Sequence, residues 1–245
     1  MAAALVVGAA LAACSSTPVH APGIAASPWA EQSGLHSGDA MRPWTHQVFP
    51  GKSPTQFTYA RLDGRDTVSV RADQSASMLR QVLRIEAQDL GRVRFSWKVP
   101  ALIEQADLAT RESDDAPVRI VLAFEGDRTR FTGKDAALSE LVRALTGEPL
   151  PYATLMYVWC NKRPAGTVIT SPRTDRIRKL VVESGAVRLN QWLDYERDIR
   201  ADYQRVFGEA PGALVGIGIM TDSDNTRTHT RAWYGPLRLL PVASR

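Results

Sequence analysis

Short runs in which apolar and polar residues alternate are the feature that most constrains the fold of this chain. The clearest run is RVRFSWKV, in which Val93, Phe95, Trp97 and Val99 alternate with charged residues and a serine. Successive side chains of a β-strand point to opposite faces, so these four residues share one face. The pattern predicts a strand with one face in the core and the other in water.

Similar runs, separated by turn residues, continue from Phe57 to the carboxyl end and predict an all-β domain. Asp63-Gly64-Arg65 and Ser184-Gly185-Ala186 stand between neighbouring runs and favour hairpins. Because helices do not alternate with the strands, a parallel sheet is not expected. The fold class predicted is mainly β: an antiparallel two-sheet sandwich of jelly-roll type with one or two peripheral helices. The expected strands are Gln56–Leu62, Thr67–Ala72, Met78–Ile85, Val93–Val99, Arg119–Phe124, Thr154–Trp159, Arg178–Val182, Val187–Tyr195, Leu214–Met220 and Arg231–Leu239.

Two segments have a helical period instead. Lys134–Thr146 places four apolar residues on one stripe and ends before Gly147. Asp198–Phe207 does the same and ends before Gly208. These segments are the expected peripheral helices.

The composition fits one soluble domain. The chain has 245 residues, of which 44% are hydrophobic and 23% charged, and its formal net charge is +4. A chain of this length is within the range of a single core. The charges form no run of one sign, so no nucleic-acid partner is expected. Residues 51–245 are predicted to form a single β-sandwich domain.

The amino-terminal segment predicts where in the cell the protein is located. Residues 1–13 are uncharged and apolar but only about half as long as a membrane-spanning helix, which is typical of a signal peptide. Leu11-Ala12-Ala13-Cys14 resembles the lipobox of bacterial lipoproteins, in which the cysteine carries the lipid anchor. The residue after Cys14 is a serine, which by the same resemblance favours the outer membrane, facing the periplasm. Residues 14–50, rich in proline and small residues, are expected to be a flexible tether.

Trp29 and Trp44 lie in that tether and are expected to dock on the domain without regular structure. Cys160 is the only other cysteine of the chain, so acylation of Cys14 would leave no intramolecular disulfide. The fold must then depend on its core. Cys160 lies in an apolar run, where a buried thiol is expected.

Several longer motifs occur in a fixed order between about Val48 and Leu239. They are FSWKV at 95–99, DDAPVR at 114–119, YVW at 157–159, ERD at 196–198, FGEAP at 207–211 and MTDSDNT at 220–226. Together they resemble the bacterial family of unknown function DUF3047. The resemblance implies a secreted or periplasmic β-rich domain without an established activity.

The sequence contains no motif of nucleophilic or cofactor chemistry. It has no Gly-x-Ser-x-Gly elbow, phosphate-binding loop or dinucleotide fingerprint. Its four histidines have no metal-ligand spacing, so no transition metal and no organic cofactor is expected. Asp222 and Asp224, followed by Asn225, offer hard oxygen ligands that would suit calcium. A polar turn whose side chains bond their own backbone, or a polar ligand site, explains this pattern as well.

Arg119 lies on the strand face opposite Val118 and Ile120 and follows Asp114 and Asp115 closely. An arginine of this kind pairs with a carboxylate, which belongs either to a neighbouring aspartate or to a ligand. Both interpretations remain open from the sequence.

The chain has six tryptophans, and tryptophan on a sheet face is able to stack on sugar rings. Trp97 and Trp159 alternate in phase with apolar neighbours, which favours core packing. Trp192 and Trp233 stand beside charged or polar residues and are the better candidates for exposure.

Three functions are compatible with these patterns. The first is a non-catalytic envelope lipoprotein that binds a glycan or another polar ligand around Arg119, Trp159, Asn161, Asp222 and Asp224, with Asp115 and Asn225 beside them. The second is a glycoside hydrolase or polysaccharide lyase that uses paired carboxylates such as Asp115 and Asp222. The third is a structural role in envelope assembly, in which these polar residues form internal ion pairs.

Overall fold

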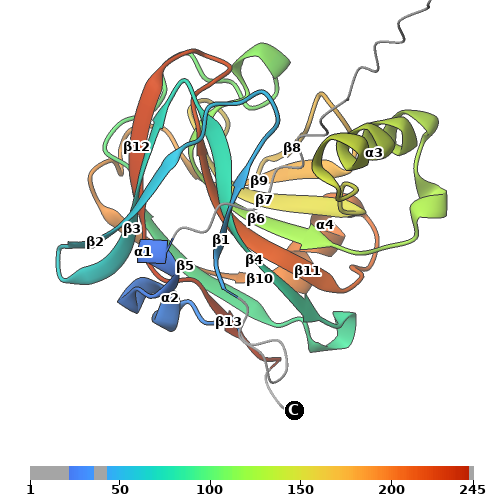
Figure 1. Ribbon diagram of the computed structural model, residues 1–245, viewed down its shortest axis with the longest axis horizontal. Coiled ribbons are helices and arrows are strands. Elements are labelled where there is room, and N and C mark those ends of the chain that lie inside the picture. Colours follow the sequence, from blue (N-terminus) through green and yellow to red (C-terminus); the bar gives the residue numbers. More distant parts are fainter. Residues whose placement is uncertain (1–21, 36–42, 243–245) are drawn as a thin grey trace, which may run out of the picture.

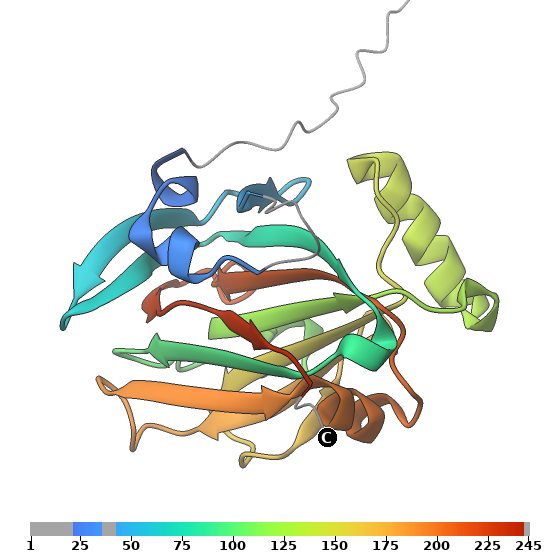
Figure 2. The ribbon, with the colours of Figure 1, turned by 90° about the horizontal axis from the view of Figure 1, so that it is seen from below.

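Two β-sheets packed face to face form the body of the protein (Figures 1 and 2). The computed structural model describes residues 22–35 and 43–242. The two packed sheets confirm the predicted mainly β sandwich. Neighbouring strands within the described ranges are antiparallel, except that β7 (Ala153–Cys160) and β9 (Ile177–Ser184) run parallel. The long connection between them, which contains β8, makes that parallel pairing possible.

The larger sheet has seven strands. In order across the sheet they are β1 (Thr45–Val48), β4 (Ala76–Ile85), β11 (Leu214–Asp222), β6 (Ala116–Phe124), β7, β9 and β8 (Val168–Thr170). The smaller sheet has six strands. Five follow the order β10 (Trp192–Asp198), β5 (Arg92–Lys98), β12 (His229–Tyr234), β3 (Arg65–Asp73) and β2 (Gln56–Leu62), and β13 (Arg238–Leu240) also pairs with β5.

Most strands match the expected runs, with differences at turns and edges. The run expected to begin at Val187 becomes a strand only at Trp192, because Asn190 adopts a left-handed turn conformation with φ of 62°. The last expected run splits into β12 and β13 at Gly235 and Pro236. A Cβ at Gly235 would come within 2.1 Å of Ser96 Oγ, so the chain passes too close to β5 for another residue. The short strands β1 and β8 were not predicted.

The facing sides of the two sheets form the main core. Trp97 and Phe95 of β5 pack there with Tyr157 of β7, and the Phe95 and Tyr157 rings stack 5.6 Å apart. All three side chains are at most 2% exposed. Full burial of each such side chain stabilises the fold by about 1.5–3 kcal/mol. The alternation in the sequence therefore identified the inner faces correctly.

Both predicted peripheral helices are present. Helix α3 (Gly133–Thr146) begins after Thr132, whose hydroxyl accepts a hydrogen bond from Asp135 N, and ends at Gly147 in the left-handed conformation. Helix α4 (Ile199–Phe207) is capped by Asp198. Figure 2 shows α3 standing at one end of the sandwich, beside the sheets. In the described ranges, neither these helices nor any other is long and apolar enough to cross a bilayer.

The described part of the expected tether is structured and packs on the sandwich. It contains α1 (Pro22–Ala25), α2 (Pro28–Gln32) and β1. Trp29 and Trp44 dock in the main core, with exposed fractions of 0% and 2% and ring centres 4.9 Å apart. A proline after a serine cap starts α2, so proline here begins a helix and does not mark a flexible linker. Cys14 and the signal-peptide region 1–13 lie outside the described residues.

Candidate functional site

The outer face of the seven-stranded sheet, which points away from the smaller sheet, carries a second apolar surface. On β4, Leu79 and Leu83 point into the main core, while Met78 and Val82 are half-buried on the other face. The same division occurs on β6, where Val121 and Ala123 line the outer face while Ile120 and Leu122 lie in the main core. An apolar outer face on adjacent strands indicates that something other than the second sheet covers it.

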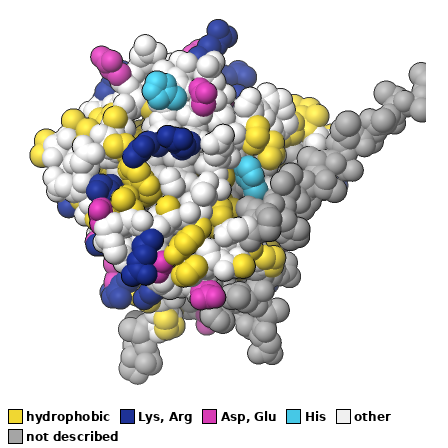
Figure 3. Space-filling model, turned by 60° about the vertical axis from the view of Figure 1, so that its left-hand side comes forward, with side chains coloured by type: hydrophobic (Ala, Val, Ile, Leu, Met, Phe, Trp, Pro, Cys, Tyr) yellow, Lys and Arg dark blue, Asp and Glu magenta, His cyan; other side chains and the backbone are white. Residues whose placement is uncertain are grey.

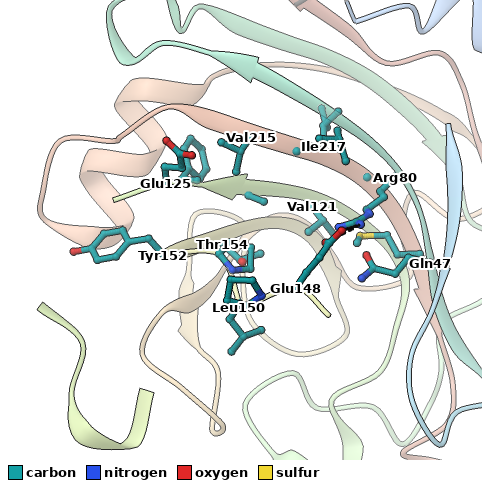
Figure 4. Close-up of a pocket in the computed structure, with 18 of the residues that line it drawn as sticks. Gln47, Arg80, Val121, Glu125, Glu148, Leu150, Tyr152, Thr154, Val215 and Ile217 are labelled. Atoms are coloured by element: carbon teal, nitrogen blue, oxygen red, sulfur yellow. Dashed lines mark hydrogen bonds and ion pairs between the residues drawn. The ribbon is translucent and has the colours of Figure 1, made fainter. Parts of the chain in front are cut away.

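A cleft of about 1050 Å³ lies over this face (Figure 4). Side chains from β4, β6, β7 and β11 form its floor. They include Met78, Val82, Val121, Met156 and Met220. Its volume is that of a site for a small molecule or a short segment of chain. Methionine side chains adapt their shape easily, so the floor suits a flexible apolar ligand.

Helix α3 and the segment after it form one wall of the cleft. Val142 and Leu145 of α3 line it, and Leu150 projects from the following segment (Figure 4). Leu141 and Leu145 are 56% and 53% exposed. Leucines on a helix are normally buried against a neighbour, so the apolar stripe of α3 is only partly covered within the described chain.

Charged side chains at the rim of the cleft are paired with one another. Arg80 donates to both carboxylate oxygens of Glu148, at 3.0 and 2.8 Å, and the two side chains point toward each other in Figure 4. Arg84 pairs with Glu86 and Glu125 at 2.6 and 2.8 Å. Each of the three acidic side chains that line the cleft therefore has an arginine partner, and Arg128, which also lines the cleft, brings the balance to three arginines against three glutamates.

A glycine keeps the floor of the cleft open. A Cβ at Gly216 of β11 would meet Ala123 Cβ at 3.6 Å and Gln81 O at 3.7 Å, which are ordinary contacts. A larger residue is therefore sterically possible there and would project into the cleft. At Gly218, by contrast, a Cβ would lie 2.7 Å from Met78 Sδ. The two glycines allow separate tests of ligand binding and of packing.

Residues 101–116 cover the other part of the same sheet face. Leu108 packs there against Val158, Ile169 and Val181 in a second, small hydrophobic cluster. The outer face is thus divided into an open part, which is the cleft, and a part closed by this segment.

A buried group of four charges lies at the border of the closed part. Arg119 Nε and Nη2 donate to the two oxygens of Asp222 at 2.8 and 2.9 Å, and Nη2 also donates to Asp114. Lys179 Nζ donates to Asp114 Oδ2 and to Leu108 O, each at 2.6 Å. Arg119, Asp222, Asp114 and Lys179 are at most 5% exposed, and we call them the buried charge cluster.

The environment of the cluster shifts the pKa of each member. Burial raises the pKa of Asp222 to about 6, although Arg119 opposes this change. Burial and the neighbouring Arg119 lower the pKa of Lys179 to about 8. Burial would raise the pKa of Asp114, but Arg119 and Lys179 outweigh it and lower that pKa. Two cations and two carboxylates balance at neutral pH, which is how a protein tolerates buried charges.

Asp115 anchors the loop that follows β11. Its carboxylate accepts hydrogen bonds from the backbone and side chains of Asn225 and Thr226, at 2.6 to 3.2 Å. Carboxylate oxygens of Asp115, Asp222 and Asp224 lie within 4.8 Å of one another, an arrangement that resembles the expected calcium ligands. However, Asp222 is paired with Arg119, and Asp224 with Lys52. Calcium binding stays a prediction, and the two cationic side chains oppose it.

The remaining predicted ligand residues lie elsewhere. Trp159 is 1% exposed on the inner face, and its Nε1 donates to Gly185 O at 3.0 Å. Asn161 donates to the carbonyl oxygens of Ile103 and Ala106 in the covering segment. The expected common rim around Arg119, Trp159 and Asn161 therefore does not form. Trp159 points into the sandwich while Arg119 points out of it, as their strand positions require.

The residues that line the cleft were not singled out from the sequence. A signal for them exists on β6, where both alternating sets of residues are apolar, Val121 and Ala123 as well as Ile120 and Leu122. A strand of this kind is covered on both faces. The sequence shows that a second apolar surface exists, but not whether protein or a ligand covers it.

The model of the family "protein of unknown function (DUF3047)" matches residues 42–238. The chain belongs to this family. The match spans nearly the whole sandwich, including the cleft, the buried charge cluster and the 220–226 loop. The family assignment predicted from the ordered motifs is confirmed. A search of curated proteins found no match.

Several solved structures are similar in fold. The xyloglucanase domain of NopAA, a type three effector from Sinorhizobium fredii, in complex with cellobiose, has 11% identity and a TM-score of 0.42 over 81% of this chain and 93% of that one. Endoglucanase 3 of Trichoderma harzianum, from family GH12, has 11% identity and a TM-score of 0.44, with coverages of 84% and 93%. The endo-1,4-β-glucanase CelB2 has 9% identity and a TM-score of 0.34, with coverages of 84% and 88%. These identities and TM-scores describe a similarity in the arrangement of strands only and assign no activity to this chain.

Proposed function

We propose that this protein is a non-catalytic binding protein that holds the hydrocarbon part of an amphiphilic ligand in the cleft. The observation that carries the proposal is the aliphatic and methionine-rich floor of the cleft, which remains half-exposed on strands whose other face is fully packed. Each methylene group that such a surface removes from water contributes about 0.8 kcal/mol. About ten buried methylenes would supply the roughly 8 kcal/mol that micromolar binding requires.

The wall formed by α3 supports the same ligand chemistry. An alkyl chain lying between the sheet and α3 would contact Val142 and cover the exposed flank of Leu145. The rim constrains the head group, because its arginines and glutamates already neutralise each other. A neutral or zwitterionic head group fits that rim better than a strongly charged one.

A hydrolytic function has less support. Glycoside hydrolysis needs two carboxyl groups on either side of a bound sugar. The glutamates at the rim are paired with arginines, and Asp115 and Asp222 are buried among donors of the chain itself. A sugar also stacks best on flat aromatic rings, whereas the floor is aliphatic and methionine-rich.

We also propose that the protein works while tethered through Cys14 to the outer membrane, facing the periplasm. The support is the resemblance of the 11–14 segment to a lipobox. Amphiphiles are concentrated at such a surface. Incorporation of a labelled fatty acid into the wild-type protein, but not into the Cys14→Ser variant, is the expected result, and an unlabelled wild-type protein would contradict the tether.

The cleft proposal is tested with octyl, decyl and dodecyl maltoside, each below its micellar concentration, and with maltose alone, by isothermal titration calorimetry. We expect affinity to rise about fourfold per added methylene until the cleft is full, because each contributes about 0.8 kcal/mol. Maltose alone should not bind in the cleft. Equal affinity of maltose and dodecyl maltoside would overturn the proposal.

Gly216→Leu is the blocking variant. Its side chain takes the room of about three methylenes and should weaken dodecyl maltoside binding about 60-fold. Gly216→Ala is the matched control, since it changes the same position and leaves most of the cleft open. A Gly216→Leu variant that folds normally and binds as the wild type does would place the ligand elsewhere.

A further inference from the structure

The outer face of the six-stranded sheet carries two tryptophans in one row across the strands. Trp192 of β10 is paired in register with Lys98 of β5, and Lys98 with Trp233 of β12. The row continues through Ser69 of β3 to Thr58 of β2. Residues directly opposite each other on neighbouring strands share a face, so all five point away from the core. We call them the tryptophan row.

The two indoles of the row differ from the other four in their exposure. Trp192 and Trp233 are half-buried, whereas Trp29, Trp44, Trp97 and Trp159 are at most 2% exposed. The polar neighbours of Trp192 and Trp233 in the sequence predict this difference. The indoles of the row lie outside the sandwich, on the face opposite to Trp97, and contribute nothing to packing between the sheets.

The spacing of the indoles follows from the strand order. Because β5 lies between β10 and β12, the two tryptophans are two strand spacings apart, or about 9.6 Å. The aliphatic stem of Lys98 lies between them and extends the apolar strip. Two flat rings on one strip can contact two sugar rings of an extended chain at the same time.

Polar groups surround the strip. Asp63 Oδ2 accepts from Lys98 Nζ at 2.7 Å and from Trp192 Nε1 at 3.0 Å. Thr58 is exposed and Ser69 half-buried, so both hydroxyls lie at the surface beside the strip. Figure 3 shows the side of the molecule with β2, β3 and β12, where basic and hydrophobic side chains lie interspersed on the surface.

A shallow depression of about 540 Å³ lies on the same side of the sandwich. It is lined in part by Arg65, Arg94, Asp194 and Glu196. The Arg65 guanidinium lies 5.0 Å from the Trp192 ring centre, and Arg231 lies 4.3 Å from that of Trp233. Contacts of this kind are weak at exposed positions, so a ligand is able to displace or extend them.

We propose that the tryptophan row binds an extended polysaccharide chain. The apolar faces of two sugar rings would stack on Trp192 and Trp233, because an indole matches a pyranose in shape and attracts its C–H groups. The hydroxyl groups of the sugars would bond to the polar residues beside the strip. This site is on the sheet that does not form the cleft, so glycan binding and binding in the cleft can be tested independently.

The test uses cellohexaose, chitohexaose and purified peptidoglycan fragments as probes. We measure their binding by calorimetry and their protection of tryptophan fluorescence from acrylamide. Because only the indoles of the row are partly exposed in the described chain, a bound glycan should reduce quenching in the wild-type protein. The corresponding disaccharides should bind more weakly, since they are too short to cover both rings fully.

Trp192→Ala and Trp233→Ala should each weaken the binding of the best hexasaccharide about tenfold, and the double variant should abolish it. Trp233→Phe, which keeps a smaller ring, should retain part of the affinity. Gly216→Leu is the control and should bind the glycan as the wild type does. Failure of every probe to protect the indoles, or unchanged affinity of the double variant, would overturn the proposal.

Discussion

Substitution of Arg119 distinguishes an internal ion pair from a ligand-binding arginine. Arg119 is 2% exposed and makes its strongest contacts with Asp222 and Asp114 at 2.8 to 3.1 Å. Arg119→Met keeps much of the volume but leaves two buried carboxylates facing Lys179 alone. Removing one partner of a buried pair costs about 3–5 kcal/mol, because the remaining charge is left uncompensated. We expect a loss of that size in the free energy of unfolding.

A double-mutant cycle with Asp222→Asn measures the coupling. The double variant again has balanced charges, Lys179 against Asp114, so its loss should be at least about 1.5 kcal/mol smaller than the sum of the two single losses. Urea unfolding at pH 7, followed by tryptophan fluorescence, gives the required free energies. Losses that simply add, or a loss below about 1 kcal/mol for Arg119→Met, would refute the reasoning.

Three further predictions concern the buried groups and the amino-terminal segment. The folded-state pKa of Lys179, about 8, lies below its unfolded value of 10.5, so the unfolded chain holds the proton more tightly. The free energy of unfolding should therefore rise by about 1–2 kcal/mol between pH 8 and 9.5, and Lys179→Met should lack that rise in urea titrations. Trp29→Ala should lower the free energy of unfolding by about 3–5 kcal/mol, because residues 22–35 pack into the core of the domain. Val187→Ala is the control and should have no effect, since Val187 is 89% exposed. A loss under about 1 kcal/mol for Trp29→Ala would show that residues 22–35 are a tether outside the domain. Gly218→Ala should destabilise by about 1–3 kcal/mol, because its Cβ would lie 3.0 Å from the backbone oxygen of Leu79 as well as 2.7 Å from Met78 Sδ. Gly216→Ala lacks such close contacts, and equal melting temperatures of the two variants would contradict this account.

Local pattern sufficed for most strands of the sandwich, although not for the short strands β1 and β8. The alternation in RVRFSWKV placed Phe95 and Trp97 in the core, since strand geometry alone decides which side chains share a face. The same rule put Arg119 on the outer face of β6. The stripes and caps of α3 and α4 were equally local, because a helix end depends on the few residues around it.

The prediction of a flexible tether, which was based on proline and small residues, was wrong for the described part of the amino-terminal segment. In residues 22–35 they start two short helices instead of a linker, because Trp29 and Trp44 bury each other in a core that the local sequence does not reveal. Such an override by packing is not visible in composition. Burial of two indoles outweighs the low helix propensity of the segment.

The sequence by itself determined which residues point the same way and, through its ordered motifs, the family. Only the tertiary structure decided what stands opposite each face. It joined Arg119 to Asp222 across 103 residues and left Met78, Val121 and Met220 open beside α3. It also aligned Trp192 with Trp233 through Lys98. Strand order and register set these neighbours, and they depend on the packing of the whole chain, which no local period encodes.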